Sequence, residues 1–188
     1  MLKKIKIGLL HGINYIKKNL AIRIPCIYLI PKPQAIYLIP SIKCNSKCIM
    51  CSFWSKKDVT LSFKQWQKVI DNLYDWCGPY VKINISGGET LLPGVMHQVI
   101  SYCIKKFPLT GIVSNGFLID KKEAKKLIQK NFNNINISID GNTKKTVNMI
   151  RGQPFAFKRS RNAIKYLVNE KNKQKNIQKL LLNLLLWD

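Results

Sequence analysis

The sequence predicts an α/β fold organised around a parallel sheet. From about residue 35 onward, strand-like and helix-like segments alternate along the chain, which is the order typical of parallel strands joined by crossover helices. The chain has 188 residues, of which 46% are hydrophobic, enough for one domain with its own core. Polar motifs directly follow each of the predicted strands, and they supply the third indication.

The strands are short apolar runs that end at turn residues. The first opens with Ala35 and ends at a cysteine-containing loop, and the last alternates asparagine and serine with isoleucine. We expect strands at residues 35–42, 80–86, 109–116 and 133–141.

Helices are expected between these strands. Ser62 and Gln65 form a capping box, and Asp120 with Glu123 marks a second helix start. A helix with Met96, Val99, Ile100 and Cys103 on one face would bury Cys103 in the core. The last helix is expected at about residues 155–168.

The four polar motifs should meet at one edge of the sheet. They are the cysteine loop, Gly87-Gly88-Glu89, Ser114-Asn115-Gly116 and Ser138-Ile139-Asp140-Gly141. In parallel α/β folds ligands bind at the carboxyl ends of the strands. Each motif alone is also ordinary turn chemistry, so it is their convergence that indicates a site.

The cysteine loop is the sharpest of these signals. Cys44, Cys48 and Cys51 follow the spacing C-x3-C-x2-C, one ligand short of a closed zinc or iron–sulfur site. A zinc site would need completion by Cys26, Cys77, Cys103, His11 or His97. None of these forms a second paired knuckle of the C-x2-C kind.

Charge and cysteine content limit the partners and the compartment. The net charge of +23 comes almost entirely from scattered lysines without a nucleic-acid-binding motif, which argues against nucleic acid. Six cysteines without a cleavable signal peptide favour a reducing, cytoplasmic location. The basic, apolar residues 1–30 are interpreted either as a membrane-surface helix or as a helix packed across the bottom of the domain.

Together these motifs resemble the radical S-adenosylmethionine (radical SAM) superfamily. The resemblance rests on the cysteine spacing, "ISGGET", "SNG", and "ISIDG" followed by "IRGQPFAF". It covers roughly residues 35–170 and implies a partial (β/α)6 TIM-like barrel with about four βα units. The pattern is similar to members that modify peptides or act in cofactor maturation.

The resemblance implies two cofactors, a 4Fe-4S cluster and S-adenosyl-L-methionine. Three thiolates would leave one iron open for S-adenosylmethionine, whose reductive cleavage would give a 5′-deoxyadenosyl radical for hydrogen abstraction from an unknown substrate. Cluster ligands would be Cys44, Cys48 and Cys51. Cofactor-binding residues would be Met50, Phe53, Gly87, Gly88, Glu89, Ser114, Asn115, Ser138, Asp140 and Arg151. Arg151 has a second interpretation as a structural partner of Asp140. Glu89 also has a second interpretation, as a helix cap or a surface carboxylate.

Partners and boundaries follow from the same resemblance. The implied electron donor is a flavodoxin- or ferredoxin-like protein, and a peptide is one candidate substrate. Residues 1–34 would form an N-terminal basic amphipathic segment, 35–170 the core, and 171–188 an atypical tail. We expect a truncated or frameshifted chain, or one half of a split protein. The alternative function is a non-catalytic remnant or accessory subunit that retains the cluster.

Overall fold

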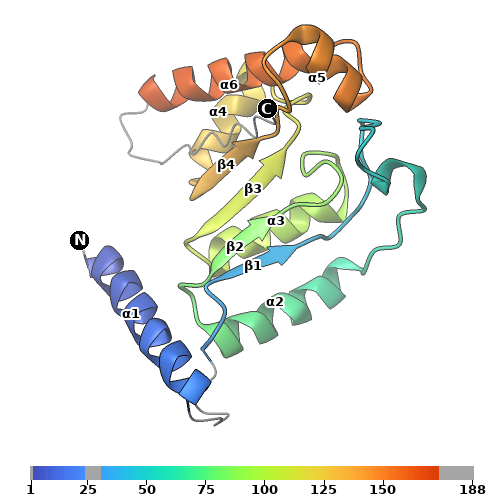
Figure 1. Cartoon of the computed structure of the whole chain (residues 1–188). Coiled ribbons are helices and arrows are strands. Elements are labelled where there is room, and N and C mark those ends of the chain that lie inside the picture. The colour runs from blue at the N-terminus through green and yellow to red at the C-terminus, as the bar shows by residue number, and fades with distance from the viewer. Residues whose placement is uncertain (1, 24–30, 174–188) are drawn as a thin grey trace.

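A parallel four-stranded sheet forms the centre of the domain. The computed structural model describes residues 2–23 and 31–173. The strands are β1 (Ala35–Leu38), β2 (Lys82–Ile85), β3 (Thr110–Ser114) and β4 (Asn134–Ile137), and they lie side by side in the order of the sequence (Figure 1). Every neighbouring pair is parallel. The predicted α/β class with four βα units is confirmed.

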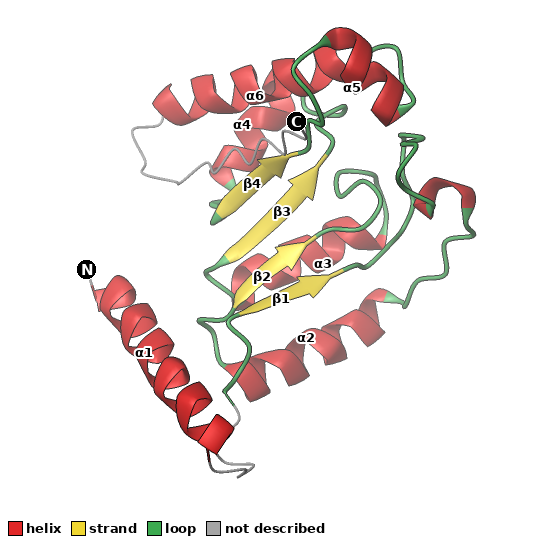
Figure 2. Ribbon diagram, in the orientation of Figure 1, coloured by secondary structure: helices red, strands yellow, loops and turns green. Residues whose placement is uncertain are grey.

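Helices connect the strands and pack against the sheet. They are α2 (Phe63–Cys77), α3 (Val95–Lys106), α4 (Lys121–Gln129) and α6 (Ala156–Lys173). Helix α2 packs beside α3 and α4 beside α6, as Figure 2 shows for the lower and upper halves of the sheet. The predicted capping residues Ser62 and Asp120 accept hydrogen bonds from the backbone N–H groups of Gln65 and Glu123, respectively.

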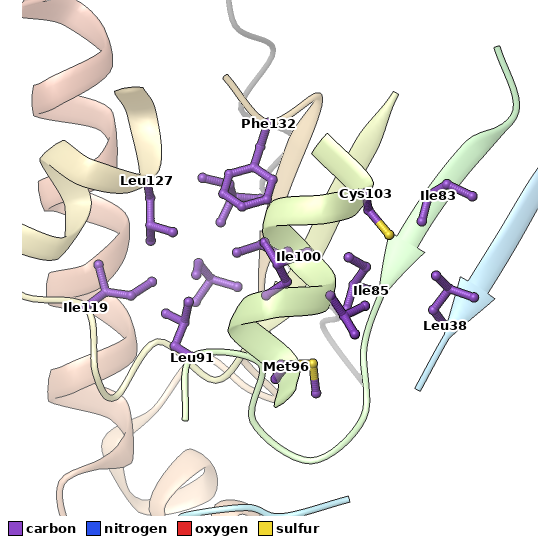
Figure 3. Packing of buried hydrophobic residues seen from close by; sticks show 14 of the residues in the cluster. Leu38, Ile83, Ile85, Leu91, Met96, Ile100, Cys103, Ile119, Leu127 and Phe132 are labelled. Carbon is purple, nitrogen blue, oxygen red and sulfur yellow. The ribbon is translucent and has the colours of Figure 1, made fainter. Parts of the chain in front are cut away.

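The core lies between the sheet and these helices. Figure 3 shows Ile83 and Ile85 of β2 facing Ile100 and Cys103 of α3. Cys103 is fully buried, and burial raises the pKa of its thiol to about 12. The prediction that this cysteine is a core residue is therefore confirmed.

The opposite face of the sheet is polar. The strand register places one row of residues side by side on this face: Tyr37, Asn84, Gly111 and Asn134. Side chains alternate between the two faces along a strand. Because the isoleucines lie on the face that the helices cover, this row of residues lies on the opposite face. Tyr37 is 69% exposed. Parallel strands in sequence order with helices on one face are the arrangement of a partial (β/α) barrel.

The predicted bounds of the strands and of the last helix were wrong. The first strand ends at Leu38 rather than residue 42, because Pro40 has no N–H to continue the ladder. The other three strands are also shorter than predicted, by one or two residues at each end except at the end of β4, which stops four residues early. The last helix continues to Lys173.

Two short helical segments were not predicted at all. Helix α5 (Lys144–Arg151) begins at the cap Thr143 and ends at Gly152, whose φ of 62° is left-handed. A single 3-10 turn, η2 (Phe53–Ser55), follows the cysteine loop.

Helix α1 (Leu2–Arg23) precedes the domain. No helix in the described part of the chain is both long and apolar enough to cross a membrane.

Candidate functional site

A pocket opens where the carboxyl ends of the strands meet. It holds about 650 Å³ of empty space including its open mouth. Its lining combines residues of β3 and of the segments that follow the four strands with Arg151 of helix α5. The residues are Cys44, Ser46, Cys48, Met50, Cys51, Phe53, Trp54, Ser86, Gly87, Gly88, Val113, Ser114, Asn115, Ser138 and Arg151. Eleven of the thirteen predicted site residues are among them; Glu89 and Asp140 are not.

The three predicted cysteines line this pocket together. Cys48 is buried, Cys44 is half-buried and Cys51 is exposed. A tight turn joins two of them, since the backbone N–H of Cys51 donates to the carbonyl of Cys48 at 3.1 Å. The indole N–H of Trp54 donates to the same carbonyl at 3.2 Å. The turn thus presents thiols from three positions to one cavity.

Two polar groups contact the sulfur of Cys48. The hydroxyl of Ser46 lies 3.2 Å from Cys48 Sγ, and Arg151 Nη1 donates to this sulfur at 3.8 Å. Ser46 Oγ also donates to the carbonyl of Arg151 at 2.7 Å. Hydrogen bonds to ligand sulfurs are among the features that set the reduction potential of an iron–sulfur centre.

The turn between α5 and α6 holds the cysteine loop in place. The N–H of Ile49 donates to the carbonyl of Ile150 at 2.9 Å, and Gln153 Nε2 donates to the carbonyl of Asn45 at 3.2 Å. Between these bonds, a Cβ added to Gly152 would lie 2.2 Å from the carbonyl oxygen of Lys47. The "IRGQ" stretch therefore supports the loop about a hundred residues earlier in the chain.

Gly87 and Gly88 allow a close contact with the start of the same loop. An added Cβ would lie 2.3 Å from the Ser41 carbonyl oxygen at Gly87, and 1.9 Å from the Lys43 carbonyl oxygen at Gly88. Both glycines line the pocket. We predicted that their missing side chains let a ligand approach; the structure shows that the missing Cβ atoms are needed by the cysteine loop itself.

Glu89 is buried behind the pocket. Its Oε1 accepts from the N–H of Leu91 at 3.0 Å and from Ser114 Oγ at 2.7 Å, and its Oε2 accepts from the N–H of Asn115 at 2.8 Å. Burial raises the pKa of this carboxyl, while these donors oppose the rise. The carboxylate joins the loops after β2 and β3, and its predicted bond to a ligand ammonium group stays a prediction.

Asn115 links the loop after β3 to the cysteine loop. Its Nδ2 donates to Asn45 Oδ1 at 2.7 Å, and its Oδ1 accepts from the N–H of Phe117 at 2.9 Å. The side chain therefore has protein partners on both amide atoms. Ser138, at the end of β4, also lines the pocket.

Asp140 and Arg151 form a buried ion pair. Arg151 Nε contacts Asp140 Oδ2, and the two side chains are 12% and 4% exposed, respectively. The structural interpretation of this pair is confirmed. Arg151 also reaches the pocket through Nη1, whereas Asp140 lies outside the lining. A direct contact of Asp140 with a ligand stays a prediction.

The side chains of the pocket that could bind a metal are the three thiols. Within the described ranges, no three His, Cys, Asp or Glu side chains are already arranged to hold a metal ion. The three thiols share one pocket, and no His, Asp or Glu belongs to its lining. Of the proposed zinc completers, Cys103 is in the core, Cys77 and His11 line another hollow, and Cys26 lies outside the described residues. Three soft donors suit an iron–sulfur cluster better than a closed zinc site.

Four lining residues were not among the predicted site residues. Ser46 and Trp54 belong to the segment that carries the cysteines, Ser86 directly follows β2, and Val113 lies in β3. Ser46 had a usable signal, because it stands between two cysteines of the loop. The positions of Ser86 and Val113 follow only from the register of the sheet.

Comparison with known proteins identifies this arrangement. The profile of the Radical SAM superfamily matches residues 38–179, which include every motif described above. The chain belongs to the radical SAM superfamily. Members of this superfamily are enzymes that use a 4Fe-4S cluster and S-adenosylmethionine, so the predicted family is confirmed, and the predicted enzyme class and cofactors are those of the superfamily.

An archaeal and a bacterial protein are among the relatives of this chain. The radical SAM chain is 31% identical over 119 residues to Fe-coproporphyrin III synthase of Methanosarcina barkeri, covering 61% of the chain and 29% of that protein. It is 29% identical over 129 residues to the subtilosin biosynthesis protein AlbA of Bacillus subtilis, and the match covers 66% of the chain and 28% of AlbA. The chain thus spans under a third of the length of either relative.

A solved structure agrees with the fold. SuiB of Streptococcus suis, bound to S-adenosylmethionine, superposes with a TM-score of 0.61 at 21% identity, over 73% of this chain and 32% of SuiB. SuiB bound to the precursor peptide SuiA gives a TM-score of 0.62. The likeness supports the TIM-like barrel as the fold class of the radical SAM chain.

Proposed function

We propose that the pocket binds a 4Fe-4S cluster through Cys44, Cys48 and Cys51, and S-adenosylmethionine beside it. The observation that carries the proposal is that these three thiols line one pocket with the glycine loop after β2 and the polar ends of β3 and β4. When bound, the cluster would supply an electron to S-adenosylmethionine, which yields a 5′-deoxyadenosyl radical able to abstract hydrogen from a substrate.

The residues of the pocket would each perform a distinct task. Arg151 would donate a hydrogen bond to the Cys48 thiolate, and the hydroxyl of Ser46, which donates to the carbonyl of Arg151, lies beside the same sulfur. Met50, Phe53 and Trp54 offer apolar and aromatic surface for the adenine, which a soft thioether and flat rings suit. Ser138 offers a hydroxyl to the pocket.

A peptide is our proposed substrate class. Two proteins similar to this chain point to it by name: AlbA takes part in bacteriocin biosynthesis, and SuiB has been solved with a precursor peptide. We further propose a flavodoxin- or ferredoxin-like electron donor and a cytoplasmic location. Contact with a membrane surface through residues 1–30 is also a proposal, and it depends on α1 rather than on the pocket.

The test is anaerobic reconstitution of the full chain with iron and sulfide. We expect about four irons per chain, and release of 5′-deoxyadenosine once S-adenosylmethionine and a reductant are added. Cys48→Ala should lose both, whereas Cys77→Ala, a half-buried cysteine outside the pocket, should lose neither. Equal iron content in the two variants would overturn the assignment. Iron without 5′-deoxyadenosine in the wild type would support the non-catalytic alternative.

A further inference from the structure

Helix α1 faces the domain through Leu10, His11 and Asn14. Asn14 Nδ2 donates to the carbonyl of Lys32 at 3.3 Å. Leu10, His11 and Asn14 line a small hollow together with Cys77 and Tyr80, at the end of the sheet where the strands begin. Among the described elements, none packs extensively against α1, and Figure 1 shows it standing apart from the sheet.

An apolar stripe runs along the other side of the helix. Its members are spaced by four, four, three and four residues, which places them on one face. They are Ile5, Leu9, Ile13, Ile16 and Leu20, with exposed fractions of 57%, 65%, 42%, 59% and 42%. Leu9 and Asn14 are separated by about 140° around a helix of 3.6 residues per turn. The stripe therefore points away from the domain.

The charge of α1 indicates what the stripe contacts. The helix contains six lysine or arginine residues and no acidic residue, and the first acidic residue of the chain is Asp58. An apolar stripe on a basic helix is typical of helices that lie in the interface of anionic membranes. A second copy of the chain is a poor occupant, because pairing two α1 helices would bring their cations together without any carboxylate.

We propose that α1 docks on an anionic lipid membrane through this apolar stripe. The stripe would enter the boundary between headgroups and acyl chains, and the flanking lysines would bind lipid phosphates. The pocket lies at the carboxyl ends of the strands, at the end of the sheet away from α1 (Figure 1). It would remain open to water while the protein is bound.

The test is sedimentation of the full chain with vesicles of phosphatidylglycerol and phosphatidylcholine, against vesicles of phosphatidylcholine alone. The double variant Leu9→Gln/Ile16→Gln keeps the net charge and uses a good helix former. Its partition onto anionic vesicles should fall by about tenfold for each replaced residue, because burying such a side chain exceeds the ~1.4 kcal/mol of a tenfold change. Val59→Gln is the matched control, since Val59 is 84% exposed outside α1.

Each outcome decides the proposal. Strong binding to anionic vesicles that the double variant loses and the control keeps would support it. Equal binding by all three proteins would attribute adhesion to net charge alone and overturn it. Failure of the wild type to bind, or a concentration-dependent dimer that the double variant abolishes, would also overturn it. Unchanged melting temperatures of the variants would show that the exposed stripe plays no part in folding.

Discussion

Replacing Gly88 with alanine should displace the cysteine loop. The added Cβ would lie 1.9 Å from the carbonyl oxygen of Lys43, whereas ordinary contacts begin near 3.4 Å. The loop must therefore retreat by about 1.5 Å. Such a shift breaks two backbone bonds that hold it, from Gly88 N–H to Ser41 at 3.1 Å and from Glu89 N–H to Lys43 at 2.8 Å.

The free-energy cost follows from these contacts. Overpacking a rigid backbone contact costs about 1–3 kcal/mol, and each lost hydrogen bond about 0.5–1.5 kcal/mol. Together they give roughly 2–6 kcal/mol, a large part of the ~5–15 kcal/mol that stabilises an ordinary domain. For a chain of this size, about 2 kcal/mol lowers the melting temperature by at least ~4 °C.

Thermal unfolding of the metal-free protein, followed by circular dichroism, measures this cost. Gly12→Ala is the matched control, because nothing lies within 4 Å of a Cβ added there; it should leave the melting temperature unchanged or raise it. Gly88→Ala should also bind less iron on reconstitution. If the two variants melt within about 1 °C of each other and load equal iron, the packing role of Gly88 is refuted.

Three further predictions concern the residues around the pocket. Because burial raises the folded-state pKa of Glu89, its contribution to stability should be full below its ordinary value of ~4.3 and be lost as pH rises through the raised pKa. Glu89→Gln should remove that part of the pH slope in urea unfolding, and an unchanged slope would contradict this. Arg151→Lys keeps the charge but cannot serve both Asp140 and Cys48, so the cluster potential in an EPR-monitored titration should become more negative. An unchanged potential at full iron content would exclude the contact with sulfur. Asp58→Ala removes the acceptor for Ile42 N–H and Ser41 Oγ and should destabilise the chain by about 1–3 kcal/mol in denaturant, whereas Asp75→Ala should have little effect.

The sequence was most informative where local chemistry decides structure. The capping box at Ser62, the N-cap at Asp120 and the buried face around Cys103 depend on residues within one helix, and all were correctly predicted. Helix α5 was missed because its eight residues are mostly polar and bury only Val147. Its importance lies in the turn at Gly152, which is defined by a contact with Lys47 far away in the sequence.

The sequence predicted which residues form the site, but not what each of them contacts. Motif order indicated which residues converge, because parallel strands bring their carboxyl ends together. The sequence could not reveal that Gly88 lies against Lys43, or that three donors within the protein occupy the carboxylate of Glu89. Those roles depend on the distance between two loops, which only the folded chain defines.

The central claim is that three thiols hold a cluster whose open iron takes S-adenosylmethionine. The most direct measurement is the EPR spectrum of the reduced, reconstituted chain before and after S-adenosylmethionine is added. We expect a 4Fe-4S signal that changes when S-adenosylmethionine is added and that is absent from Cys48→Ala. A signal from the wild-type protein that S-adenosylmethionine leaves unchanged, or a signal that persists in Cys48→Ala, would contradict it.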